Sequence, residues 1–419
     1  MRLRVLFSLS VLVAVWWLAG RPGADLLMGF VEGTGSSAPQ AEAAAGRPVV
    51  VLSPAYGWWS ADSKQIDPGP QSAGLVEKDV ALDVSQQAQE ILARCPLDVR
   101  LTRTGDDSQH TLANVHEIVN DDHPTLAVAI HTSDPNAPSG AAAFYTVNGE
   151  DDAGSQRLSA ELADAVSARL GLPNLGVRPE TASPTGGLYI HPWQAPAALV
   201  DVGSLGADAS ALRNHRRDFA RAIAQAVLND MSVPLDCADG LQLPNAASLV
   251  GISFPSQPLS QNLSVQNDGM ADWNPAHYQL VSAGDAYGAA ANYALPAVVA
   301  PGQTATWALP ARAPTSAGVY EQLWQLTRDG TAVGPVVKVF IVVVPQEAQG
   351  LKDKLDQQVA EWQAAGSAKV DDMSKQMQAE IKAWAVQQAQ KQAANCLGAN
   401  GAVLLGVVWV ARKRRSRAD

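Results

Sequence analysis

The sequence has little of what marks several common classes of protein. Only three cysteines, Cys95, Cys237 and Cys396, occur among 419 residues, and their spacing matches no cysteine-based metal site. Basic residues are outnumbered, with 30 Lys and Arg against 41 Asp and Glu, so the formal net charge is −11. A chain this acidic is a poor partner for nucleic acid, which we exclude. If the protein is exported, Cys95 and Cys237 either form one disulfide or remain buried thiols.

Long apolar runs occur only near the two ends of the sequence. Residues 1–24 open with the basic segment Met1–Arg4 and continue as an apolar stretch, which is typical of a signal peptide or signal anchor. Residues 25–47 are small and polar enough for a linker. Residues 397–411 are apolar and precede a basic tail at 412–419, which indicates a C-terminal transmembrane anchor, or else a helix at the membrane surface. We therefore expect an extracytoplasmic protein that is anchored to the cell membrane and has a cytoplasmic C-terminal tail.

Residues 48–231 alternate short apolar runs with amphipathic patterns, as strands and helices alternate in an α/β domain. The apolar runs are rich in branched residues and end at turn residues, which is typical of buried strands. We therefore predict a mixed sheet with helices on both faces. Strands are expected at 48–52, 99–101, 126–134, 141–147, 188–190 and 197–202, and helices at 80–92, 112–119, 155–170 and 211–229.

Two residues in this part stand where a ligand site is expected. His131 follows the apolar run LAVAI, at the carboxyl end of a predicted strand, where open α/β sheets bind their ligands. Glu77 lies where a Gly- and Pro-rich loop meets a predicted helix, and a carboxylate there also stabilises the helix through its dipole. Each residue therefore has a structural explanation beside the functional one.

The order of motifs in residues 48–231 resembles that of zinc-dependent N-acetylmuramoyl-L-alanine amidases. The matching segments are VVVLSPAYG, DPGPQSAGLVEKDVALDV, LTRTGD, LAVAIHTSD, SQRLSAELADAV and PAALVDVGSLG. The resemblance implies an amidase-type α/β fold and peptidoglycan or its muropeptides as the partner. It also implies a zinc ion held by two histidines and a glutamate, with a second glutamate acting on the zinc-bound water.

Carried over position by position, the resemblance predicts a degenerate site. Glu77 in EKD and His131 in AIHTSD match two of the zinc ligands. Tyr56 in SPAYGW stands at the position of the first histidine, and Asp201 in LVDVG stands at the position of the catalytic glutamate. A phenol with a pKa near 10 is a poor zinc ligand, and an aspartate is one methylene shorter than a glutamate. His191 is a candidate for a compensating ligand.

Two functions follow from this resemblance. One is a protein that binds cell-wall peptides and glycans, with zinc hydrolase activity reduced or lost. The other is an active amidase that cleaves the amide between muramic acid and L-alanine during peptidoglycan turnover. The substitutions at Tyr56 and Asp201 favour the first function. Trp58, Trp59 and Trp193 either offer an aromatic surface for sugar rings at the mouth of the site or pack in the interior.

Residues 240–345 consist of short apolar or alternating runs separated by Gly, Pro, Asn and Asp, a pattern that predicts an antiparallel β-sandwich. The segment resembles the immunoglobulin-like four-tryptophan domain, with Trp273, Trp307 and Trp324 at its characteristic positions. That resemblance implies a role in binding or spacing. Its ligand is not specified by the sequence.

Residues 346–394 carry apolar side chains mostly at steps of three and four, which predicts an amphipathic helix of coiled-coil type. Three arrangements fit this pattern. A continuous helix would form a stalk through which copies of the chain associate as a homo-oligomer. The alternatives are a helical hairpin bent at Gly366 and Ser367, or a helix folded back onto the sandwich.

Overall fold

The computed structural model describes residues 46–148, 151–182, 189–244, 246–365 and 372–391. The predicted leader at 1–24, the anchor at 397–411 and the basic tail at 412–419 all lie outside these residues, as does most of the predicted linker. Within the described ranges, no helix is both long and apolar enough to cross a membrane.

A six-stranded mixed sheet forms the centre of the first domain, which confirms the predicted α/β class. β6, β1, β7 and β10 run parallel to one another, whereas β8 is antiparallel to β10 and parallel to β9. The central strand β7 is buried along its whole length, which explains why its sequence is an unbroken apolar run. In sheet order the strands are β6 (Asp98–Leu101), β1 (Val49–Pro54), β7 (Leu126–Ser133), β10 (Ala197–Ser204), β8 (Ala141–Tyr145) and β9 (Asn174–Pro179).

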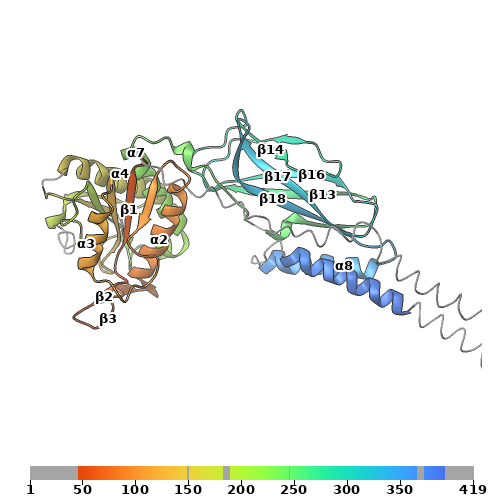
Figure 1. Cartoon of the computed structure of the whole chain (residues 1–419), viewed down its shortest axis with the longest axis horizontal. Helices are drawn as coiled ribbons and strands as arrows, with labels where there is room; N and C mark the ends of the chain where they lie inside the picture. The colour runs from red at the N-terminus through yellow and green to blue at the C-terminus, as the bar shows by residue number, and fades with distance from the viewer. Residues whose placement is uncertain (1–45, 149–150, 183–188, 245, 366–371, 392–419) are drawn as a thin grey trace, which may run out of the picture. The chain divides into compact units, whose positions relative to one another are not determined.

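Helices cover both faces of this sheet (Figure 1). One face packs against α2 (Glu77–Leu92), α4 (Asp152–Leu170) and α7 (Arg216–Asp230), and the other against α3 (Leu112–Asp121). Alternate residues of each strand therefore enter two different cores. In β7, residues 128 and 130 lie on the α2 side and residues 127 and 129 on the α3 side.

Two predicted elements of this domain are wrong. In the run predicted as a strand at 188–190, residue 188 lies outside the described residues, Tyr189 is helical and Ile190 is in a turn, and the side chains of these two residues pack in the core on the α3 side. The edge strand is instead β9, whose Gly176 and mostly half-buried side chains give a weak strand pattern. The helix predicted at 211–229 is two helices, α6 (Ala209–Asn214) and α7, separated at His215.

The second domain contains a five-stranded and a three-stranded sheet. The predicted antiparallel pairing is confirmed for these sheets with one exception, because β12 and β18 are parallel. Trp273, Trp307 and Trp324 lie together in the core between the sheets, with 0 to 5% of their surface exposed, so all three are packing residues. The first sheet is β12 (Val250–Ser253), β18 (Thr331–Val343), β17 (Gly318–Arg328), β14 (Tyr278–Ser282) and β15 (Asn292–Ala294), and the second is β11 (Leu241–Gln242), β13 (Pro258–Asn267) and β16 (Thr304–Arg312).

Two helices follow the sandwich, α8 (Gln349–Ala365) and a helix at residues 372–391. Their apolar faces share one core with Phe340 and Val342 of β18, and Lys354 of α8 pairs with Glu380 of the second helix at 2.7 Å. The helical segment therefore packs back onto the sandwich. A single continuous stalk is not what the structure shows, and self-association through this segment stays a prediction.

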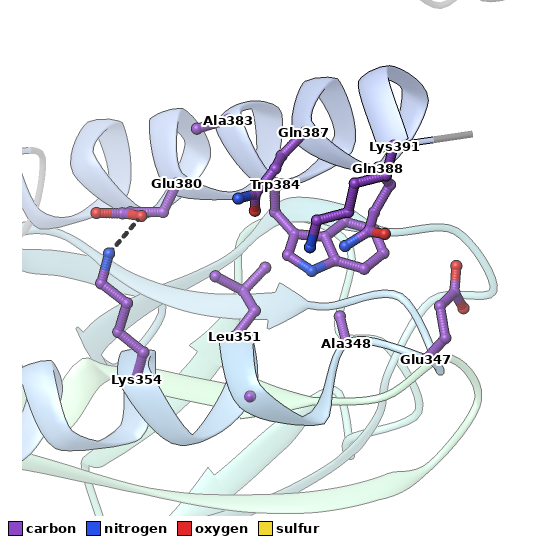
Figure 2. A pocket seen from close by; sticks show the side chains of 11 residues that line it. Glu347, Ala348, Leu351, Lys354, Glu380, Ala383, Trp384, Gln387, Gln388 and Lys391 are labelled. Atoms are coloured by element: carbon purple, nitrogen blue, oxygen red, sulfur yellow. Dashed lines mark hydrogen bonds and ion pairs between the residues drawn. The ribbon is translucent and has the colours of Figure 1, made fainter. Parts of the chain in front are cut away.

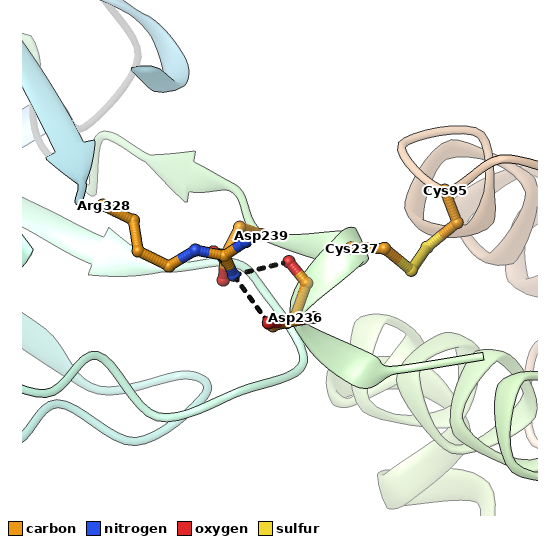
Figure 3. Close-up of a disulfide and its surroundings, with 5 residues drawn as sticks. All are labelled: Cys95, Asp236, Cys237, Asp239 and Arg328. Atoms are coloured by element: carbon orange, nitrogen blue, oxygen red, sulfur yellow. Dashed lines mark hydrogen bonds and ion pairs between the residues drawn. A yellow bond between two sulfur atoms is a disulfide. The ribbon is translucent and has the colours of Figure 1, made fainter. Parts of the chain in front are cut away.

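A disulfide ties the end of α2 to the segment that follows α7 (Figure 3). It joins Cys95 to Cys237, whose Cα atoms are 4.9 Å apart and which are separated by 142 residues in the sequence. Cys237 lies in a short 3₁₀ helix, Leu235–Ala238, that leads into the sandwich. Of the two alternatives for these cysteines, the disulfide is therefore the one found.

A buried ionic cluster also links the two domains. Asp268 of the sandwich accepts hydrogen bonds from Arg94, which follows α2, and from Arg217 and Arg221 of α7, at 2.5 to 2.9 Å. Burial alone would raise the pKa of Asp268, but the hydrogen bonds from Arg217 and Arg94 outweigh it and hold the pKa below its ordinary value. The carboxylate is thus ionised at neutral pH and pairs with three buried or half-buried guanidinium groups.

Candidate functional site

His131 and Asp201 lie side by side at the carboxyl ends of β7 and β10. The two residues are paired in the register of the parallel sheet. Because residues 127 and 129 of β7 and residues 197 and 199 of β10 point to the α3 side, alternation places His131 and Asp201 on that same face. Strand periodicity therefore brings together two of the side chains that the motifs predict.

Glu77 reaches the same place from the first turn of α2. Its Oε1 accepts a hydrogen bond from the backbone N–H of Thr132 at 2.9 Å and lies 3.3 Å from Nδ1 of His131. The two side chains are almost completely buried. The preceding loop fixes the position of Glu77, because the backbone N–H of Glu77 donates a hydrogen bond to the carbonyl of Pro70 at 3.0 Å. A carboxylate at this helix start is also favoured by the helix dipole.

Asp201 has an unusual acidity in this setting. Burial raises its pKa to about 6, and the neighbouring carboxylate of Glu77 adds to the rise, while His131 opposes it. The Oγ of Ser133 donates to Asp201 Oδ2 at 3.3 Å, which also opposes the rise. A carboxylate with a pKa of about 6 is ionised at neutral pH and is within reach of proton transfer there.

Tyr56 is held at the site by a strained turn after β1. Its φ is +54°, a value that non-glycine residues rarely adopt, and Gly57 follows with a φ of +81°. The ring lies against Gly69, where a Cβ atom would approach Tyr56 Cδ2 to 2.4 Å, and its centroid is 5.9 Å from that of His131. Burial, together with the carboxylates of Glu77 and Asp67, raises the pKa of Tyr56 well above its ordinary value. The side chain is therefore a neutral phenol.

Tyr189 is a member of the site that the sequence reasoning missed. Its ring meets the imidazole of His131 edge-on at a centroid distance of 4.2 Å, and it also contacts Tyr56 and Trp58, at 6.1 and 5.5 Å. Burial raises the pKa of Tyr189 well above its ordinary value, so this second phenol is also neutral. The run Leu-Tyr-Ile predicts a strand, and no motif in the sequence identifies the tyrosine as a site residue.

His191 is engaged elsewhere. Its Nδ1 lies 2.7 Å from Oε1 of Glu180, a fully buried carboxylate whose Oε2 accepts the backbone N–H of Val147 at 2.7 Å. No contact among the described residues joins His191 to Glu77 or His131. The structure therefore gives no support for His191 as a compensating ligand.

The tryptophans near the site mostly pack in the interior. Trp58 is 4% exposed and Trp193 is fully buried in the core on the α3 side, where its Nε1 donates to Nδ1 of His116 at 3.2 Å. Trp59 is half-buried. Two of the three candidates for an aromatic surface are therefore core residues.

The residues that gather here do not fit a zinc ion held in the manner of the resembled amidases. Such a site needs three imidazole, thiolate or carboxylate ligands beside the open position. Glu77 and His131 supply two, and the third position holds the neutral phenol of Tyr56. Within the described residues, no group of three or more His, Cys, Asp or Glu side chains is arranged to hold a metal ion. His131 Nε2 is buried without a hydrogen-bond partner in that part of the chain, so one imidazole nitrogen remains uncommitted.

Comparison with known proteins agrees with the motifs. Residues 50–231 match a family model described as N-acetylmuramoyl-L-alanine amidase. This part of the chain, which is similar to that family, is called the amidase-type domain. The family is generally zinc-dependent, whereas the described side chains at this site do not form a set of three zinc ligands. A search of the curated proteins finds no match to the chain.

The chain is similar over this part to several solved structures of amidases. They include CwlD from Clostridioides difficile in complex with the GerS lipoprotein, at 22% identity over 45% of this chain and 100% of that chain, with a TM-score of 0.39. AmiC2 of Nostoc punctiforme is 22% identical over 45% of this chain and 98% of its own, with a TM-score of 0.37. Ami1 from Mycobacterium smegmatis is 20% identical over 44% and 97%, with a TM-score of 0.38.

The sandwich has a match of its own. Residues 253–343 match a family model described as an Ig-like domain from next to BRCA1 gene. This match does not identify a four-tryptophan domain, so the four-tryptophan assignment stays a prediction.

Proposed function

We propose that the amidase-type domain binds the peptide stems and glycan of peptidoglycan at the cell envelope without zinc-dependent hydrolysis. The proposal rests on the match of residues 50–231 to the amidase family together with the altered site. Open α/β sheets bind their ligands at the carboxyl ends of their strands, which is where Glu77, His131 and Asp201 lie, so we place the muropeptide site there. Binding to that site does not need the metal that cleavage needs.

One observation supports the proposed loss of hydrolytic activity. Two neutral phenols, Tyr56 and Tyr189, pack against His131 where the family's pattern calls for a third ligand. A neutral phenol binds zinc weakly at neutral pH, and the loss of one ligand from a set of three lowers metal affinity by orders of magnitude. Activation of a water by a bound metal is then lost with the metal.

The competing function is an active amidase with an altered site, and one observation favours it. His131 lies beside both Glu77 and Asp201, and Asp201 retains a carboxylate that is ionised near neutral pH. Metal content and product formation distinguish the two functions.

The extracytoplasmic location is part of the proposal. It is supported by the cell-wall substrate of the matched family and by the Cys95–Cys237 disulfide, since disulfides persist in oxidising compartments. The predicted leader at 1–24 and anchor at 397–411 fit the same location. We propose membrane attachment on that basis.

The test combines metal analysis with a muropeptide assay on the full chain. Zinc per chain is measured by mass spectrometry after dialysis against zinc-containing buffer, and an N-acetylmuramoyl tripeptide is followed by calorimetry for binding and by chromatography for cleavage. We expect well under one zinc per chain, measurable binding and no release of tripeptide. One zinc per chain with cleavage would establish the active amidase instead. Absence of both binding and cleavage would contradict both functions.

A further inference from the structure

A hollow of about 610 Å³ lies between the two C-terminal helices and the turn that follows β18 (Figure 2). Its volume is within the range of small-ligand sites in proteins. Leu351 and Ala348 provide an apolar floor, and the indole of Trp384 projects from the helix at 372–391 towards them. The hollow is far in sequence from the amidase-type domain and is used by nothing described above.

Three polar side chains of the hollow lie near Trp384 and form no hydrogen bond or ion pair with the residues that the structure describes. Gln387, Gln388 and Lys391 follow it on the same helix and line the hollow. In the part of the chain that the structure describes, none of these three has a hydrogen-bond or ion-pair partner. By contrast, polar residues of α8 such as Gln349 are paired within their own helix. Three free donor groups beside one aromatic ring can therefore bind a ligand without breaking an existing interaction.

The charges that line the hollow cancel. Lys354 and Glu380 form an ion pair at 2.7 Å at one end, and Lys391 and Glu347 carry one charge of each sign at the other. A balanced lining gives no field that would favour an anion or a cation. The ligand that fits is neutral, with an apolar face for the indole and groups that accept and donate hydrogen bonds at its edge.

We propose that this hollow binds N-acetylhexosamine units of a glycan. A pyranose ring has an apolar face of C–H groups that packs on an aromatic ring, and its hydroxyls lie at the edge, within reach of amide side chains. The acetamido group adds an amide for Gln387 or Gln388 and a methyl group for the floor at Ala348 and Leu351. The inference stands on the helical pair alone and is independent of the proposed function of the amidase-type domain.

Triacetylchitotriose, titrated into the full chain by calorimetry, tests the inference. We expect saturable binding that Trp384→Ala weakens by about tenfold or more, the loss expected when an aromatic contact of this kind is removed. Trp362→Ala is the matched control, because Trp362 is also partly buried in the same helical core but does not line the hollow. The double variant Gln387→Ala/Gln388→Ala, at surface positions, is expected to weaken binding with the helical circular dichroism unchanged.

Three outcomes would overturn the inference. The first is no binding of triacetylchitotriose by the unaltered chain. The second is an equal loss of binding affinity in the Trp384 and Trp362 variants, which would attribute the loss to general stability. No loss of affinity in either variant would likewise place the binding site elsewhere. The third is that an uncapped stem peptide binds at Trp384 in place of the sugar. None of these outcomes changes the result of the muropeptide assay, so a failure of the glycan-binding proposal can be told apart from a failure of the function proposed for the amidase-type domain.

Discussion

The ring of Tyr189 stands perpendicular to the imidazole of His131, with an interplanar angle of 88° and a centroid distance of 4.2 Å. This contact sets the surroundings of the one histidine that the motif pattern retains. Tyr56 closes the same cluster from the turn after β1. The candidate site is therefore a cluster of aromatic rings packed around a buried Glu77–His131 pair, and its chemistry follows from that packing.

Restoration of the family's pattern should restore metal binding. The double variant Tyr56→His/Asp201→Glu adds an imidazole beside Glu77 and His131 and lengthens the carboxylate. Histidine tolerates the positive φ at position 56 better than most residues. We expect zinc affinity to rise by at least about a hundredfold, measured by competition with a chromogenic chelator. His191→Ala is expected to leave that affinity unchanged, and an unchanged affinity in the double variant would show that the positions are misaligned.

The close contact between Gly69 and Tyr56 gives a matched pair of glycine variants. Gly69 and Gly74 both have positive φ, at +65° and +75°, so alanine strains the backbone at either position by about 1–2 kcal/mol. Only at Gly69 does the added Cβ meet the ring of Tyr56, at 2.4 Å, whereas nothing lies within 4 Å at Gly74. We expect Gly69→Ala to lower the free energy of unfolding more than Gly74→Ala, measured by urea denaturation. Equal losses would mean that the ring of Tyr56 is not held against Gly69.

Removal of the disulfide should destabilise the protein markedly. The Cys95–Cys237 bond closes a loop of 142 residues, and cross-links of this kind typically contribute about 2–4 kcal/mol. We expect the variant Cys95→Ser/Cys237→Ser to lose stability of that size in urea denaturation. Cys396→Ser is the control, since that cysteine forms no part of the bond, and it should unfold as the unaltered chain does.

The ionic cluster at Asp268 predicts a second large effect. Asp268→Asn leaves Arg94, Arg217 and Arg221 without their shared carboxylate, and breaking a buried ion pair from one side typically costs about 3–5 kcal/mol. Asp272→Asn alters an exposed carboxylate nearby and should change the free energy of unfolding by less than about 0.5 kcal/mol. Similar stabilities of the two variants would contradict the role of the cluster.

The same cluster predicts the direction of a pH dependence. Because the pKa of Asp268 is lower in the folded chain than its ordinary value, its stabilising effect is complete above about pH 4. It is lost as the pH falls through the lowered folded pKa. We expect the difference in stability between the unaltered chain and Asp268→Asn to be constant from pH 7 to 5 and to shrink below pH 4, followed by urea denaturation at each pH. A difference in stability between the two proteins that shrinks as the pH rises towards 7 would contradict a lowered pKa of Asp268 in the folded chain.

Much of the amidase-type domain could be predicted from residue patterns because its strands and motifs are local. The run LAVAI marks a strand buried on both faces, and this places His131 at its end without any knowledge of the fold. The pairing of His131 with Asp201 then follows from strand register. Tyr189 could not be predicted, because its position depends on the connection between β9 and β10, where no periodicity constrains the side chains.

The C-terminal helices show a different limit. The spacing of Leu351, Leu355 and Val359 is equally compatible with a stalk, a hairpin or a helix packed on the sandwich. What decides between them is the apolar surface that Phe340 and Val342 of β18 present, and that surface exists only once the sheet has formed. An amphipathic pattern identifies a buried face but not the partner that buries it.

The covalent link between Cys95 and Cys237 has a consequence for the way in which the chain responds to proteolysis. A single cut of the backbone anywhere between these positions would leave both pieces attached through sulfur, and residues 96–236 include β7, β10 and α7. The nicked chain would run as one species on an oxidised gel and separate into two only after reduction. The domain can thus be cut in its backbone while its pieces stay covalently joined.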